Sequence, residues 1–270
     1  MRGVSRASLA EVEERLEPLT TDPQMAGTVA DELFAVARLL ATQSVLRRAL
    51  ADPSRTAETR SGLATSVLTG KVSQQTADLV AAVAAARWSA PSDLTVAVEQ
   101  LAVQAVVAAA EHEGNLDDLE DELFRFGRIV ASQPALRMAL TNPFVSADAK
   151  RQLLSQLLAG KVTPEALQLI TEAAASPIGR SLDLSLEEYA RLAARRRERL
   201  VAEVHVAVAM TSAQRSRLID ALTDTYGHAV YLNVVLDPRI TGGMTVRVGD
   251  ELIDGSVATR LGEAQRKLAS

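Results

Sequence analysis

An internal repeat with a period of 90 residues is the feature that most constrains how this 270-residue chain can fold. Asp31-Glu-Leu-Phe34 recurs as Asp121-Glu-Leu-Phe124, and the offset, 121 minus 31, is 90 residues. At the same offset, Gly70-Lys71-Val72 recurs as Gly160-Lys161-Val162. Because the register does not change between these motifs, the sequence predicts two similar structural copies in tandem.

Apolar residues in both copies recur at helical spacing. These positions are Val29, Leu33, Val36 and Leu40 in the first copy and Leu119, Leu123, Phe126 and Val130 in the second. Spacing of i, i+4, i+7 and i+11 predicts amphipathic helices that bury one face. Aromatic residues make up only 3% of the chain, which favours close-packed helices built from small side chains.

Prolines, glycines and hydroxyl residues mark where the helices of each copy begin and end. Helix is disfavoured just before the proline in Asp52-Pro53 and Asn142-Pro143. Gly70 and Gly160 suit C-terminal caps. A helix from about residue 93 to 112 is expected to close the first copy and open the second. The predicted N-caps are Ser54, Ser73, Ser146 and Thr163.

The hydrophobic period changes from helical to alternating after Arg199, which predicts a different C-terminal module. We expect strands at residues 201–208, 229–236 and 244–248, a helix from Thr211 or Ser212 to Tyr226, and a final helix after Ser256. The fold class is therefore mainly α with a small α/β module. The expected domains are a first helical repeat at 1–92, a second at 93–200 and the module at 201–270.

A string of residues in this module carries a specific family pattern. It comprises Gly227, Asp237, Pro238, Ile240, Gly242, Gly243, Val246, Val248, Gly249, Asp250, Ile253, Asp254, Gly255, Ser256 and Leu261. This string resembles the C-terminal signature of the ATP synthase delta (oligomycin-sensitivity-conferring) family. Residues 93–200 are similar to that family's six-helix domain in the number and order of helices. The chain departs from the family by carrying an extra copy before Asp93.

The resemblance implies a stator subunit with no catalytic, cofactor or metal site. Such a subunit links the catalytic alpha/beta head of an F-type ATP synthase to the membrane-anchored b-type stalk and resists rotary torque. The implied partners are the N-terminal helix of an alpha subunit and the b-type stalk. The implied place is the cytoplasmic face of the cell membrane, with membrane association only through the complex.

Two sets of apolar residues are the candidate contacts for these partners. The alpha-subunit groove is expected to lie between the first and fifth helices of one bundle. Its candidate residues are Val103, Val106, Val107, Ala110, Leu167, Ile170 and Ala174. The candidate stalk contact consists of Val246, Val248 and Ile253. Apolar residues at helical spacing are core residues by default, so burial is the competing interpretation of these positions.

Two other classes of function stay open. A tandem helical adaptor unrelated to ATP synthase would need only the two bundles, and recovery without synthase subunits would favour it. An enzyme would need a nucleophile with a base, or paired acids in a cleft. His112, His205 and His228 have no second ligand at i+3 or i+4, and no P-loop lysine follows Gly242-Gly243.

Composition narrows the partners further. The formal net charge of -5 disfavours nucleic acid as a partner, and the lack of cysteine excludes disulfides and cysteine-based zinc sites. The most apolar run, at residues 101–110, is far shorter than the roughly 20 residues that span a bilayer. The run Arg195-Arg-Arg-Glu-Arg199 is expected to be a solvated face or to make salt bridges to an acidic partner.

Overall fold

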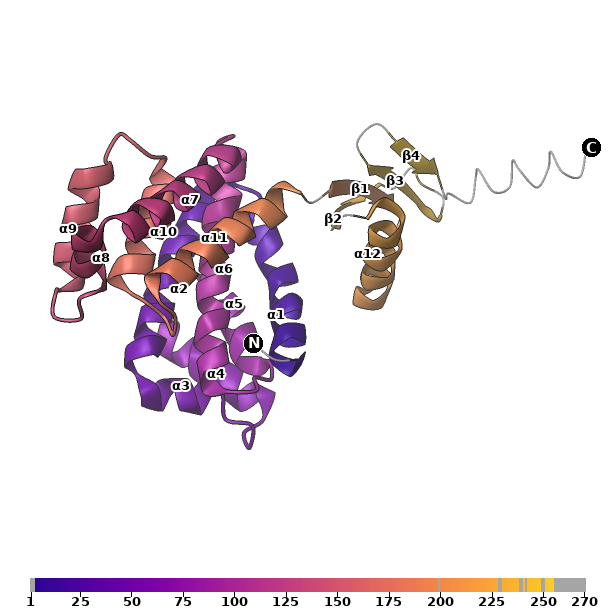
Figure 1. The fold of residues 1–270 in the computed structure, drawn as a ribbon. Coiled ribbons are helices and arrows are strands. Elements are labelled where there is room, and N and C mark those ends of the chain that lie inside the picture. The colour runs from indigo at the N-terminus through magenta and orange to yellow at the C-terminus, as the bar shows by residue number, and fades with distance from the viewer. Residues whose placement is uncertain are drawn as a thin grey trace, which may run out of the picture. The chain divides into compact units, whose positions relative to one another are not determined.

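The chain forms two compact units in the computed structural model, a helical unit at Met1–Arg197 and a C-terminal unit at Glu198–Ser270 (Figure 1). The structure describes residues 3–198, 200–227, 230–237, 240, 242–248 and 251–254. The predicted division between residues 92 and 93 separates two repeats that share the helical unit. The unit boundary lies within a few residues of the predicted one at 200 and 201.

The helical unit is built from two copies of one helix order joined by a shared helix. The first copy has α1 (Gly3–Leu16), the 3-10 turn η1 (Glu17–Thr20), α2 (Pro23–Thr42), α3 (Ser44–Leu50), α4 (Ala57–Leu68) and α5 (Gln74–Ala85). The shared helix is α6 (Pro91–His112). The second copy continues with α7 (Leu116–Ser132), α8 (Pro134–Thr141), α9 (Ala147–Leu158), α10 (Pro164–Ala175) and α11 (Leu182–Arg197). The bounds of α9 and α10 are those of α4 and α5 plus 90, which confirms the register predicted from sequence.

A carboxylate clamp at the start of α5 recurs at the start of α10. The Ser73 backbone N donates to Glu32 Oε1 at 2.8 Å and its hydroxyl donates to Glu32 Oε2 at 2.6 Å. In the second copy, the backbone N and hydroxyl of Thr163 donate to Glu122 Oε2 at 2.9 and 2.8 Å. Each clamp ties the second helix of a copy to the N-terminus of the fifth.

Three of the four predicted N-caps are confirmed. Ser73, Ser146 and Thr163 each accept a hydrogen bond from a backbone N in the first turn of their helix. Ser54 is a wrong prediction, because Thr56 caps α4 and the Ser54 hydroxyl donates to Asp52 instead. Thr56 is the residue 90 positions before Ser146, so the repeat itself identifies the correct cap.

The shared helix α6 runs through the middle of the helical unit (Figure 1). It is buried on nearly every side, because it is the last helix of one copy and the first of the next. By length and apolar composition alone it passes as a membrane span, the one such helix in the described part of the chain. Its side chains lie in the core of the helical unit, which is the ordinary place for a helix of this composition.

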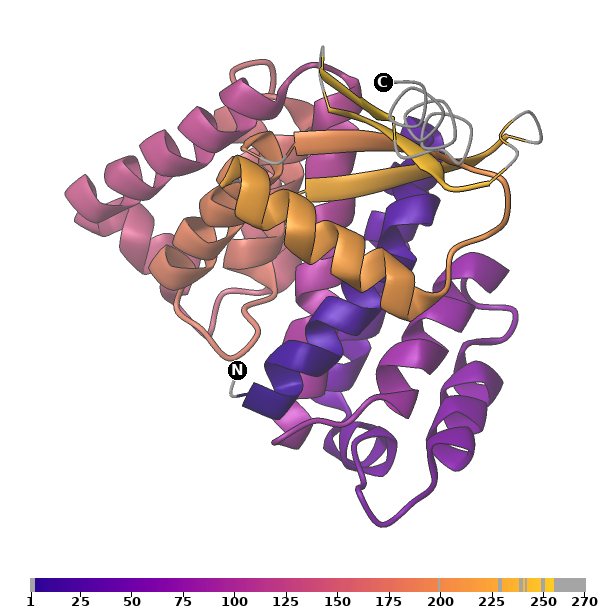
Figure 2. The ribbon, with the colours of Figure 1, turned by 90° about the vertical axis from the view of Figure 1, so that its right-hand side faces the viewer.

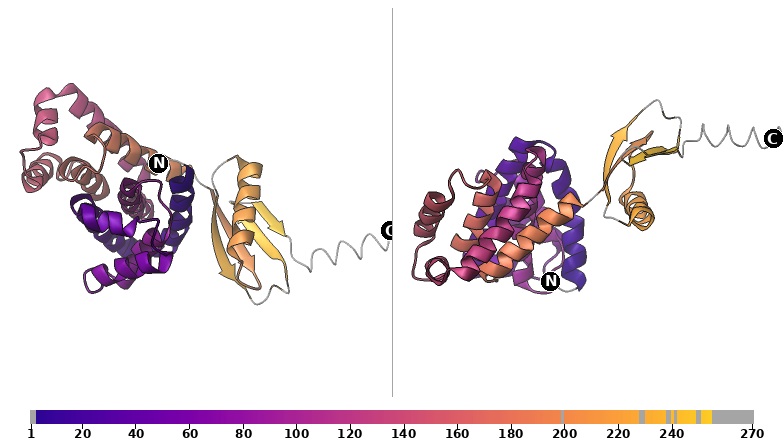
Figure 3. Two further views of the ribbon diagram at one scale, coloured as in Figure 1. Left: turned by 90° about the horizontal axis from the view of Figure 1, so that it is seen from below. Right: turned by 45° about the horizontal axis from the view of Figure 1, so that its top comes forward.

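The C-terminal unit is a four-stranded sheet with one long helix. Its elements are β1 (Leu200–Val206), α12 (Ser212–Tyr226), β2 (Val230–Leu236), β3 (Met244–Val248) and β4 (Glu251–Asp254). The strand order is β2-β1-β3-β4, with β1 and β2 parallel and the other pairs antiparallel. Figures 2 and 3 show α12 lying on one face of this sheet. Strand β4 was not predicted, and the predicted helix after Ser256 lies outside the described residues.

Replacement of the capping serine, Ser73→Ala, is expected to lower the free energy of unfolding by about 1 kcal/mol, because α5 loses its side-chain cap and Glu32 loses a donor. Urea unfolding measures the change. The control Ser66→Ala removes an exposed hydroxyl of α4 that bonds only within its own helix, so it should stay within about 0.5 kcal/mol. Equal effects of the two substitutions would show that the clamp does not stabilise the fold.

Candidate helix-binding groove

The second copy has a groove between its first and fifth helices, α6 and α10, and α2 of the first copy lies in it, leaving a hollow of about 360 Å³ that all three helices line. Helix α2 packs along α6. Its Arg38 Nη1 donates to Glu172 Oε2 of α10 at 2.8 Å, and Gln168 Nε2 of α10 donates to Asp31 Oδ1 of α2 at 2.8 Å. The two copies are therefore joined by a helix seated in a groove and flanked by polar contacts.

The residues that the sequence predicted for an alpha-subunit groove lie on α6 and α10. Val103, Val106, Val107, Ala110, Ile170 and Ala174 are buried in the core, and Leu167 is half-buried. These side chains pack against the chain's own helices. The competing interpretation of the Ala- and Val-rich helices as core fits these six positions.

The equivalent groove of the first copy, between α1 and α5, is open. It encloses a volume of about 520 Å³ and is lined by Val4, Ala7, Ser8, Glu11, Val12, Arg15, Ala82, Ala85, Ala86 and Arg87. Most of these side chains are small, so another helix can approach the backbone closely and gain many dispersion contacts. We name this surface the α1–α5 groove.

Equivalent residues of α6 and α1 differ in their exposure to solvent. Leu94, Ala97, Leu101 and Ala105 of α6 form one stripe, and each is at most 1% exposed. The residues 90 positions earlier, Val4, Ala7, Glu11 and Arg15 of α1, are all exposed. The same helix face is thus buried by a helix in one copy and open to solvent in the other.

A buried polar cluster joins α6 to the second copy. The Tyr189 hydroxyl donates to Glu99 Oε1 at 2.7 Å, and Arg180 pairs with the other oxygen of Glu99. Burial raises the pKa of Glu99, and the charge of Arg180 and the hydrogen bond from Tyr189 only partly oppose that effect. Burial and the carboxylate of Glu99 together raise the pKa of Tyr189. Tyr189 and Glu99 are 90 residues apart, so they occupy equivalent positions of the repeat, and these two equivalent residues are in direct contact.

The arginine run near the end of α11 pairs with acidic groups of the same unit. Arg196 Nε lies 2.7 Å from Glu111 Oε2, and its Nη2 lies 3.4 Å from Glu17 Oε1. Arg197 Nη1 lies 2.7 Å from Glu120 Oε2. Glu111 and Glu120, on either side of the α6–α7 turn, therefore pair with arginines of the same chain, which the sequence did not predict.

The candidate stalk residues of the C-terminal unit divide between core and surface. Val246 and Val248 of β3 are buried in the core of this unit with Val204 and Leu232. Ile253 on β4 is 41% exposed, beside the exposed Leu252. Only Ile253 of the three presents a large apolar surface.

The described residues of the family string mostly set backbone geometry. Gly227 ends α12 in the left-handed conformation with φ of 71°, and Gly242 and Gly243 also have positive φ before β3. The Asp237 backbone N donates to Val206 O at 2.9 Å, and Ile240 N donates to Asp237 O at 3.1 Å. Pro238, Gly249, Asp250, Gly255, Ser256 and Leu261 lie outside the described residues.

The described histidines have ordinary polar neighbours. His112 Nε2 lies 2.7 Å from Thr20 O, and His205 Nε2 lies 3.1 Å from Glu203 Oε1. Within the part of the chain that the structure describes, no three His, Cys, Asp or Glu residues are grouped as metal ligands would be. His228 lies outside that part.

Sequence reasoning missed α1, the helix that makes one wall of the open groove. Its buried residues are Ser5, Leu9, Val12 and Leu16, so one of the four positions is polar and the apolar stripe is short. The repeat could have indicated this helix, because residues 3–16 lie 90 positions before residues 93–106 of the helix predicted at 93–112. Applying the offset upstream would have predicted both α1 and its groove.

These features define a class of protein: a tandem helical repeat that presents an open helix-lined groove, followed by a small α/β module. Comparison with known proteins narrows the class. Residues 102–268 match the family model described as ATP synthase delta (OSCP) subunit. The chain is 48% identical over 269 residues to "ATP synthase subunit delta" of Thermobifida fusca, and 46% identical over 270 residues to that of Streptomyces griseus. Both alignments cover 100% of this chain and 100% of the relative.

The chain therefore belongs to the ATP synthase delta (OSCP) family. Relatives with the same name extend to Parafrankia, at 43% identity over 277 residues with 99% of each chain covered. Since these relatives match over their full length, the additional first copy is shared with them and is not an insertion peculiar to this chain.

The raised pKa of Glu99 predicts a pH dependence of stability. A carboxyl whose folded pKa lies above its ordinary value of 4.5 contributes stability that is present below that value and lost as pH rises through the folded pKa. Relative to wild type, Glu99→Gln should therefore gain stability as pH rises above 4.5. Urea unfolding at a series of pH values from about 4.5 to 7 tests this.

Glu32 is the matched control, because its pKa is shifted in the opposite direction to that of Glu99. Burial raises its pKa, but the hydrogen bonds from Ser73 and Thr76 outweigh this and hold the pKa below its ordinary value. Its contribution is present at neutral pH and is lost as pH falls, so Glu32→Gln should weaken the acid loss of stability. The same pH trend for both variants would contradict the electrostatic assignment of Glu99.

Proposed function

We propose that this chain is a non-catalytic stator subunit of an F-type ATP synthase, joining the catalytic head to the b-type peripheral stalk. Membership of the delta (OSCP) family supports the assignment to the complex. The observation that carries the mechanism is the open α1–α5 groove, whose counterpart in the second copy already holds a helix. The place of action would be the cytoplasmic face of the cell membrane, reached only through the complex.

The first partner is the N-terminal helix of an alpha subunit, and the α1–α5 groove is where it would dock. At the equivalent positions of α6, the stripe Leu94, Ala97, Leu101 and Ala105 is buried within the helical unit. A partner helix in the α1–α5 groove would cover the equivalent positions of α1 in the same way. Its apolar face would meet Ala82 and Ala85 on α5, while Glu11, Arg15 and Arg87 would lie at the rim.

The second partner is the b-type stalk subunit, which the C-terminal unit would bind through the exposed surface of β4. This strand is the last in the described strand order, and it carries Leu252 and Ile253, which are 58% and 41% exposed. A terminal strand with exposed apolar side chains offers both backbone and side-chain contacts to a partner. Val246 and Val248 would support this strand from within the core.

Resistance to torque requires that the protein transmit force between its two partners without unfolding. An exposed ion pair contributes only about 0–1 kcal/mol, so isolated surface pairs are poor means of doing this. The helical unit instead has one continuous hydrophobic core that spans both copies, from Leu9 to Ala193. Separating the copies would expose α6 and α2 together, which favours a brace that behaves as one body.

The substitution Ala7→Arg tests the first partner. A long charged side chain in the α1–α5 groove should weaken binding of a synthetic peptide with the alpha subunit's N-terminal helix sequence at least tenfold. Isothermal titration of the full chain measures the affinity. Ala10→Arg is the matched control, because Ala10 is exposed on the same helix but does not line the groove, and it should leave affinity within about twofold. Equal affinities for the two variants would place the alpha helix elsewhere.

The substitution Ile253→Asp tests the second partner. A charge on β4 should reduce binding of the soluble part of the b-type subunit at least tenfold while leaving alpha-peptide binding unchanged. The matched control is Leu236→Asp, since Leu236 is also exposed but ends β2 at the opposite side of the described sheet. If the control weakens stalk binding and Ile253→Asp does not, the stalk binds the other side of the sheet.

A further inference from the structure

The surface formed by α7 and α11 is exposed, whereas the equivalent surface of the first copy, formed by α2 and α6, is covered by other helices. Phe34 of α2 is 3% exposed, whereas Phe124, its equivalent on α7, is 61% exposed. Likewise Leu94 of α6 is 1% exposed and Leu184 of α11 is 54% exposed. The residue types are identical at both pairs of positions, so the difference arises from what packs on each surface.

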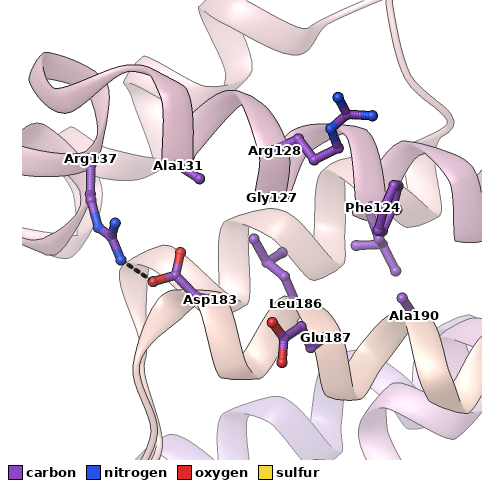
Figure 4. A pocket seen from close by; sticks show the side chains of 10 residues that line it. Phe124, Gly127, Arg128, Ala131, Arg137, Asp183, Leu186, Glu187 and Ala190 are labelled. Atoms are coloured by element: carbon purple, nitrogen blue, oxygen red, sulfur yellow. Dashed lines mark hydrogen bonds and ion pairs between the residues drawn. The ribbon is translucent and has the colours of Figure 1, made fainter.

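A hollow of about 380 Å³ lies on this uncovered surface (Figure 4). Its floor is apolar, formed by Leu123, Phe124 and Leu186 with Gly127, Ala131 and Ala190. The Arg137–Asp183 pair closes one end, and Figure 4 shows Phe124 and Arg128 at the other. Gly127 lies beside Leu186 in this floor, where an added Cβ would make ordinary van der Waals contact with Leu186 Cδ1 at 3.9 Å. We name this surface the α7–α11 hollow.

The first copy shows the kind of group that meets the equivalent surface. Arg38 on α2 binds Glu172 of α10 at 2.8 Å, and Glu172 lies on a helix whose buried residues are mainly alanine, leucine and isoleucine. Arg128 stands at the position equivalent to Arg38. It lies over the Phe124 ring, 6.0 Å from its centroid, and no carboxylate pairs with it in the described part of the chain.

We propose that the α7–α11 hollow docks an amphipathic helix of another ATP synthase subunit, one that carries a carboxylate to pair with Arg128. The occupant would resemble α10, with small apolar side chains over Phe124 and Gly127 and an acidic residue at its edge. A second copy of this chain cannot supply its own α10, because Leu169, Ile170 and Ala173 are buried in the core and Glu172 binds Arg38. This inference rests on the proposed function, since it places the chain in that complex.

The test is photocrosslinking in the intact, purified ATP synthase. A benzoylphenylalanine replaces Phe124 in one preparation, Phe144 in a second and Glu11, at the rim of the α1–α5 groove, in a third. Phe144 is the matched control, an aromatic residue that is 95% exposed and does not line the hollow. The probe at 124 should crosslink to a helical segment of another subunit at least tenfold more than the probe at 144. Adding Arg128→Glu should reduce that crosslink at least tenfold.

Each other outcome overturns the inference. A crosslink from position 124 to a second copy of this chain, or none above the level at 144, would show that no other subunit docks there. A crosslink insensitive to Arg128→Glu would remove the assigned carboxylate contact. The probe at Glu11 separates this failure from failure of the proposed function: if position 11 reaches an alpha subunit while 124 reaches nothing, only the hollow is wrong. If neither reaches a synthase subunit, both proposals fail.

Discussion

The packing of α2 into the groove between α6 and α10 is the interaction on which the rest of the helical unit depends. It packs α2 along α6 and brings Arg38 to Glu172, so that two copies of one helix order share a single core. Without it, each copy would expose a face that it cannot cover alone, as in other stacked repeats. The polar cluster around Glu99 then fixes how the second copy meets the shared helix.

A repeat array of two copies leaves one unsatisfied surface at each end. At the first end the α1–α5 groove lacks a helix like α2, and at the second end the α7–α11 hollow lacks a helix like α10. Terminal repeats are usually capped by polar residues. Here the exposed Val4 and Phe124 stand where the inner equivalents are buried. A chain with two such ends is suited to bridging other polypeptides, in line with the role of a stator brace.

Much of the fold could be predicted because the repeat supplies two samples of each local signal. The N-caps Ser73 and Thr163, and the glycines that follow α4 and α9, occupy equivalent positions. Each signal in one copy therefore supported the same prediction in the other. Which groove is open could not be predicted, since periodicity shows that a helix face is buried but not what covers it. Strand β4 was missed because its four residues lie between two turn-forming pairs, too short for an alternating pattern.

The most direct test of this account is hydrogen exchange of the full chain with and without the alpha subunit's N-terminal peptide. If α2 keeps the second groove filled, the peptide should slow exchange in α1 and α5 and leave α2 and α10 unchanged. Slower exchange at α10 together with faster exchange in α2 would mean that the partner displaces α2. That result would contradict the claim that the copies form one body with its helix-binding groove at the first end.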